Sequence, residues 1–69
     1  MQEVTKFNVV LINRDDPSIT ISYTHVNGFN TSGNHLYVEI ETGAIQSYLA
    51  TDWKHLVTEY QVYEKLPPV

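Results

Sequence analysis

The chain contains no cysteine, and only four of its 69 residues are lysine or arginine. Without cysteine it can form neither a disulfide nor a thiolate zinc site, which stabilise many small domains. The absence also fits a reducing compartment, and the N-terminus does not resemble a signal peptide, so we expect a cytoplasmic protein. One core of this size rarely supplies more than about 3–5 kcal/mol of stability. We therefore expect a single small domain, residues 1–69, that depends on good packing or on self-association.

Basic residues and long apolar runs are both scarce. Eight acids outnumber the four bases and give a net charge of −4, with the acids scattered rather than clustered. Four bases do not make the positive stripe that tracks a phosphate backbone, so we expect no direct nucleic-acid binding. No apolar run approaches the ~20 residues of a membrane helix, so we expect no membrane partner.

The first half of the chain is rich in strand-forming residues. "FNVVLIN" (7–13) is apolar on both faces, which is typical of a central or partly covered strand. "RDDPS" (14–18) predicts a turn, because proline fixes φ and Asp16 can bond to the backbone ahead of it. "SITISYTHV" (18–26) alternates apolar and polar residues, as in a half-buried strand. "NGFNTSGN" (27–34) holds two glycines and three asparagines, and predicts a long hairpin loop or a flexible binding loop.

"HLYVEIETGAIQSYL" (35–49) predicts a β-hairpin. With Thr42 and Gly43 as a two-residue turn, Ile40 faces Ile45 and Leu36 faces Leu49. This register gathers the large aliphatic side chains on one face. On the other face it sets Tyr37 opposite Tyr48 and Glu39 opposite Gln46.

"LATDWKHLVTEYQVY" (49–63) fits two structures. Trp53, Leu56, Val57 and Tyr60 have the spacing of a helical stripe, with Thr51 or Asp52 as N-cap. The residues of "VTEYQVY" (57–63) mostly favour strands, however, and Val62 breaks the stripe. We expect a short capped helical turn at 51–55 and a closing strand from about 56 to 64, ended by the prolines at 67–68.

The predicted fold is therefore mainly β. We expect a small antiparallel sheet or open barrel of about five strands, with one short helical turn near residues 51–55. The alternative is an α+β fold with a C-terminal helix at 51–64.

Residues that would indicate catalysis or metal binding form no motif. His25, His35 and His55 lack a short ligand spacing, so we expect no metal site. Asp15 and Asp16 fit turn formation better than a catalytic pair. No serine lies in a nucleophile motif, and the glycines match no phosphate-binding loop. We expect neither enzymatic activity nor a cofactor.

The aromatic residues carry the functional hypothesis. The predicted hairpin brings Tyr37 and Tyr48 together, either to stiffen the sheet or to anchor a partner. Glu39, Gln46 and Tyr63 would form a polar rim, and Trp53 would fill the core or act as a further anchor. We expect a non-enzymatic protein that binds another protein through this aromatic and acidic face. The alternative is a structural homo-oligomer. An inhibitor that imitates nucleic acid would need a more regular row of carboxylates than this chain has.

Overall fold

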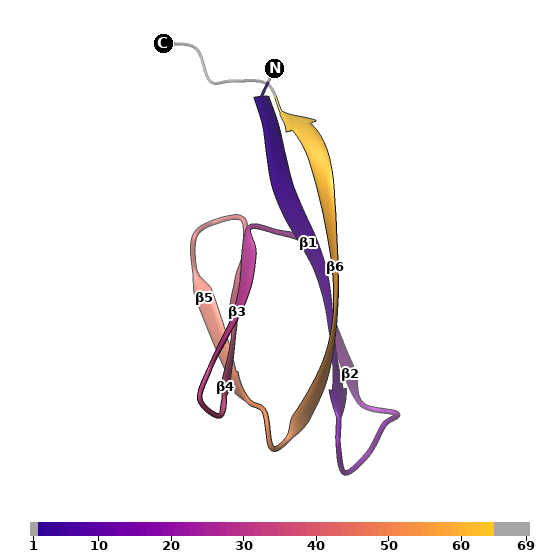
Figure 1. Cartoon of the computed structure of the whole chain (residues 1–69). Helices are drawn as coiled ribbons and strands as arrows, with labels where there is room; N and C mark the ends of the chain where they lie inside the picture. Colours follow the sequence, from indigo (N-terminus) through magenta and orange to yellow (C-terminus); the bar gives the residue numbers. More distant parts are fainter. Residues whose placement is uncertain (1, 65–69) are drawn as a thin grey trace.

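The computed structural model describes residues 2–64, which form six β-strands (Figure 1). The strands are β1 (Gln2–Asn13), β2 (Thr20–Val26), β3 (Gly28–Ser32), β4 (His35–Glu39), β5 (Ile45–Leu49) and β6 (Trp53–Glu64). They form two antiparallel sheets, in the orders β2-β1-β6 and β3-β4-β5, which do not close into a barrel. The prediction of a mainly β, antiparallel fold is confirmed, with six strands in place of five. Residues 2–64 contain no helix, and hence none that could span a membrane.

β1 and β6 form the long axis of the molecule. They pair over twelve consecutive residues, and their upper halves extend beyond β2 and beyond the second sheet (Figure 1). The longest extent of the molecule is 48 Å, against 21 and 16 Å in the other directions. β1 is the central strand of its sheet, as its apolar residues on both faces predict.

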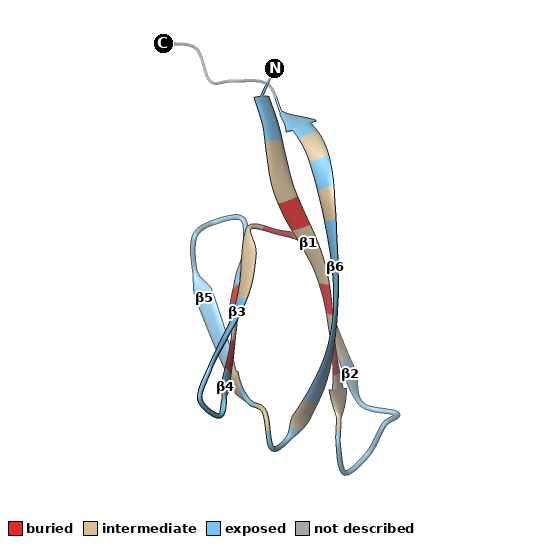
Figure 2. Cartoon of the chain, in the orientation of Figure 1, coloured by how far each residue is buried: buried red, intermediate tan, exposed pale blue. Residues whose placement is uncertain are grey.

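The core lies between the inner faces of the two sheets. β1 contributes Val9 and Leu11, β2 contributes Val26, and β4 contributes Leu36 and Val38; each is at most 2% exposed. In Figure 2 buried residues appear on β1 and β4, whereas β5 and β6 are largely exposed. The buried apolar core is therefore small, which suits the length of the chain.

The connection between β1 and β2 is the predicted turn. The Asp16 carboxylate accepts hydrogen bonds from the backbone N–H of Ser18 at 3.1 Å and from its hydroxyl at 2.6 Å. These bonds to the charged form hold the pKa of Asp16 below its ordinary value.

The pairing of β1 with β2 is interrupted by a β-bulge. The strand register shifts between Phe7 and Val9, where His25 adopts a φ of 58° as the extra residue of the bulge.

The prediction of a loop at residues 27–34 is wrong. Gly28–Ser32 form β3, which pairs with β4 along its whole length, and only residues 33 and 34 make a turn. Gly33 lies in the left-handed region at φ 58°. Pairing with β4 satisfies the backbone groups on one side of this polar edge strand, and Phe29 packs against the core. Tertiary contacts thus outweigh the weak strand propensity of glycine and asparagine.

The hairpin at 35–49 forms, but its predicted register is wrong by one residue. The loop has three residues, 41–43, and is closed by bonds from Ile40 N–H to Ala44 O at 3.0 Å and from Gly43 N–H to Ile40 O at 2.9 Å. Gly43 has a φ of 91°, as in three-residue loops that end in a glycine bulge. Tyr37 therefore pairs with Ser47, not with Tyr48.

The segment after residue 49 forms a strand, as the sequence predicts. The predicted helical turn at 51–55 and the alternative prediction of a helix at 51–64 are both wrong. A turn at 50–52, closed by a bond from Asp52 N–H to Leu49 O at 3.0 Å, leads directly into β6 at Trp53. Trp53 pairs with Asn13, so continuous pairing with β1 replaces the hydrogen bonds of a helix. The predicted end of the strand at prolines 67–68 lies outside the described residues.

Candidate functional site

The observed register separates the two tyrosines that the sequence placed together. On β4, Leu36 and Val38 face the core, so the alternate residues Tyr37 and Glu39 face outward. Tyr48 pairs with Leu36 and therefore faces inward. A slip of one residue moves a side chain to the other face of a sheet. The predicted Tyr37–Tyr48 patch does not form.

Tyr48 belongs instead to an aromatic cluster between the sheets. Its hydroxyl shares a hydrogen bond with that of Tyr23, and its ring meets the ring of Trp53 edge to face, with centroids 5.9 Å apart. Burial, with the bond to Tyr23 acting in the same direction, raises the pKa of Tyr48 to about 12. Trp53 is half-buried and packs against the core, which favours its predicted core role over that of an exposed anchor.

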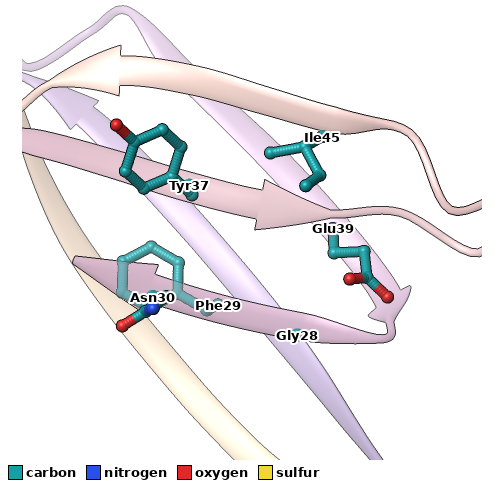
Figure 3. Close-up of a pocket in the computed structure, with 6 residues that line it drawn as sticks. All are labelled: Gly28, Phe29, Asn30, Tyr37, Glu39 and Ile45. Carbon is teal, nitrogen blue, oxygen red and sulfur yellow. The ribbon is translucent and has the colours of Figure 1, made fainter. Parts of the chain in front are cut away.

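A shallow groove of about 530 Å³ lies across the outer face of the β3-β4-β5 sheet (Figure 3). We call it the outer groove. Its lining residues come from all three strands: Gly28, Phe29, Asn30, Tyr37, Glu39 and Ile45. Phe29 packs against the core on the other side of β3, and Gly28 places no side chain in the groove. Two of the predicted binding residues, Tyr37 and Glu39, therefore do lie together.

The walls of the outer groove combine aromatic, acidic and aliphatic groups. Ile45 is directly opposite Glu39 in the β4–β5 pairing and is 61% exposed. The Tyr37 ring is half-buried and stacks on the His35 ring, with centroids 6.0 Å apart and planes 19° apart. Within residues 2–64 no ion pair engages the Glu39 carboxylate. The groove can therefore take a side chain that is both apolar and positively charged.

The other predicted rim residues lie elsewhere. Gln46 pairs with Val38 and so is on the inner side of β5, although it is exposed at this edge of the sheet. Tyr63 is 67% exposed near the end of β6, where it pairs with Glu3 at the start of β1. Neither residue lines the outer groove.

Sequence reasoning missed Ile45, Asn30 and Gly28 as groove residues. The predicted register gathers Ile45 with the other aliphatic residues on the face opposite Tyr37, and so leaves it out of the predicted site. Asn30 and Gly28 were assigned to a loop. One signal could have revealed the strand: Phe29 and Thr31 alternate with Gly28, Asn30 and Ser32, and the apolar and β-branched residues fall on one face.

The three histidines occupy three separate places. His25 lies within hydrogen-bond distance of the Tyr60 hydroxyl, at 3.0 Å, His35 stacks on Tyr37, and His55 packs near Phe29 with ring centroids 5.1 Å apart. Among the described residues, no three histidine or carboxylate side chains are grouped so that they could hold a metal ion.

A polar cluster surrounds Lys6, which is only 7% exposed. Its ammonium donates a hydrogen bond to Asn27 Oδ1 at 2.5 Å and lies 3.6 Å from Glu64 Oε1. The Asn27 amide nitrogen donates to the backbone oxygen of Ile40 at 3.3 Å. These contacts link β1, through Asn27, to the connection between β4 and β5, so they position the second sheet against the first.

Comparison with known proteins adds no relative. No protein-family model, curated protein or solved structure matches the chain.

Proposed function

We propose that this chain is a non-enzymatic protein-binding module, and that a segment of a partner protein docks in the outer groove. The observation that carries the proposal is the meeting of Tyr37, Glu39 and Ile45 on an outward sheet face. Tyrosine is enriched at the anchor points of protein interfaces. An exposed isoleucine beside it adds apolar area that a partner can cover.

The chemistry of the groove favours a partner segment with a basic side chain. A lysine or arginine stem can lie on Ile45 while its charge meets the Glu39 carboxylate and the face of Tyr37. The net charge of −4 would speed the approach of a basic partner. The same charge opposes direct nucleic-acid binding. We place the module in the cytoplasm, a proposal supported by the absence of cysteine from the chain.

Affinity capture with matched variants tests the proposal. The tagged protein is incubated with nuclease-treated lysate of its source, and retained proteins are quantified by mass spectrometry. Tyr37→Ser and Glu39→Lys should each reduce recovery of a specific partner about tenfold or more. Tyr63→Ser and Glu41→Lys are the controls, because both positions are exposed and lie outside the groove.

The variants must keep their fold for the comparison to count, so each is also melted. A partner lost with both groove variants and kept with both controls supports the proposal. A partner kept by all four variants, or lost equally with all four, contradicts it.

A further inference from the structure

β6 is a long edge strand with a regular backbone. Its twelve residues pair with β1 along one side without any break in register. No other strand among residues 2–64 pairs with its second side. Alternate N–H and C=O groups therefore lie along that side without strand partners, which makes it a template for another strand.

The other sheet edges carry features that discourage pairing. β2 has seven residues and is interrupted by the bulge at His25, and Pro17 lies in the turn before it. β3 and β5 have five residues each. Short strands, bulges and proline are the usual protections of an edge. β6 contains no proline and no bulge over Trp53–Glu64, and its one lysine is Lys54.

Apolar side chains are exposed on both faces of β6. Leu56 is 63% exposed and Val57 is 38% exposed, and adjacent strand residues point to opposite faces. Five apolar residues are buried within residues 2–64, so burial of these two side chains would add appreciably to a small total.

We propose that two copies of this chain pair antiparallel through β6, giving one continuous sheet in the order β2-β1-β6-β6-β1-β2. A two-fold axis perpendicular to the sheet keeps inner faces with inner faces, as closed dimers of identical chains require. This dimer goes beyond the proposed function, because it uses the edge of the first sheet and leaves the outer groove of the second sheet free.

The side chains of β6 select the register. With Val57 opposite Val57 of the other copy, His55 faces Glu59 and Leu56 faces Thr58. Each His55–Glu59 pair brings a carboxylate opposite an imidazole, and the two-fold axis makes two such pairs. A register centred two residues later sets Glu59 opposite Glu59, and like charges directly opposite each other are unfavourable. The β6 sequence is thus complementary to itself, which favours a second copy over an unrelated strand.

Single-cysteine variants test the geometry, because the chain has no cysteine of its own. In Val57→Cys the two introduced residues lie directly opposite each other. Opposed residues have Cα atoms about 4.5–5.5 Å apart, within the range of a disulfide. Mild oxidation should therefore cross-link most Val57→Cys chains into dimers. Thr24→Cys, on the protected edge strand β2, is the matched control and should stay largely monomeric.

Charge exchange tests the register independently. His55→Glu places a glutamate opposite Glu59 of the other copy. Glu59→Lys places a lysine opposite His55 of the other copy. Each should raise the dimer dissociation constant by about tenfold, and the double exchange should restore it. Molar mass is measured by sedimentation equilibrium from about 1 µM to about 500 µM, where self-association appears as a rise above the 7.9 kDa monomer.

A wild-type protein that stays monomeric over this range, or equal cross-linking of Val57→Cys and Thr24→Cys, overturns the β6 dimer. Failure of the double exchange to restore dimerisation overturns the register. Partner capture with the Tyr37 and Glu39 variants is unaffected by these outcomes, so the dimer and the outer groove are tested separately.

Discussion

The hydroxyl groups of Tyr23 and Tyr48 share a hydrogen bond that joins the two sheets. Tyr23 comes from β2 of the first sheet and Tyr48 from β5 of the second, 25 residues later in the chain. Their rings meet edge to face with centroids 6.3 Å apart. The part of the chain that the structure describes buries five apolar side chains, and this contact adds a polar link between the two sheets that pack on them.

The raised pKa of Tyr48 predicts a loss of stability in alkali. The phenol ionises near pH 10 in the unfolded chain and near pH 12 in the folded protein. Between these values the unfolded state binds fewer protons, so the free energy of unfolding falls as the pH rises. The loss attributable to Tyr48 should therefore appear between about pH 10 and about pH 12.

Urea unfolding at about pH 9.5 and about pH 11.5 measures this loss. Tyr48→Phe is the control, because it keeps the ring but cannot ionise, while the other four tyrosines remain. The variant should lose less stability than the wild type between the two pH values. An equal loss in both proteins would contradict the assignment to Tyr48.

Exchange of each hairpin tyrosine for serine should reduce stability more on the inner face of the sheet than on the outer face. Tyr48→Ser removes a ring that packs on Trp53 and Tyr23, and should cost about 2–3 kcal/mol in the free energy of unfolding. Tyr37→Ser removes a ring that faces away from the core, and should cost less than about 1 kcal/mol. Urea midpoints of the two variants provide the comparison. Equal costs would be inconsistent with the observed register.

The strand content could be predicted from the sequence because it depends on local pattern. The alternation in β2 and the strand-forming residues of β6 are visible within each segment. The turn at Asp16 is also a local matter of proline and carboxylate chemistry. These features need no knowledge of what packs against the segment.

The division of the strands into two sheets, and with it the candidate site, could not be predicted in the same way. A two-residue and a three-residue loop both fit "ETG", and they differ by one residue in register. In the observed register Tyr48 faces inward and contacts Tyr23, which lies on the other sheet and is not visible in the local pattern. Matching aliphatic residues to one another favoured the wrong register, because β5 leaves Ile45 and Leu49 exposed. Tyr37 and Glu39 were nevertheless placed correctly, since their alternation on β4 does not depend on the partner strand.

Glycine exchange tests the left-handed backbone conformation at Gly43 in this loop. Gly43 has a φ of 91°, where a side chain is strained, so Gly43→Ala should cost about 1–2 kcal/mol in the free energy of unfolding. Gly28 is the control: an added Cβ there meets nothing within 4 Å, and its φ lies outside the left-handed region. Gly28→Ala should change stability by less than about 1 kcal/mol. Chemical denaturation of both variants provides the comparison, and equal effects would argue against a left-handed Gly43.

Asn27 should contribute more to the free energy of unfolding than a surface asparagine, because it accepts a hydrogen bond from the buried Lys6 ammonium. Asn27→Ala removes the 2.5 Å bond to Lys6 and the bond to the Ile40 carbonyl, and should cost about 1–3 kcal/mol. Lys6→Met in the same chain removes the charge that was left with fewer partners, and should recover part of this loss. A double-mutant cycle by urea unfolding measures the coupling between the two positions. Additive effects of the two exchanges would mean that Lys6 draws its support from Glu64 alone.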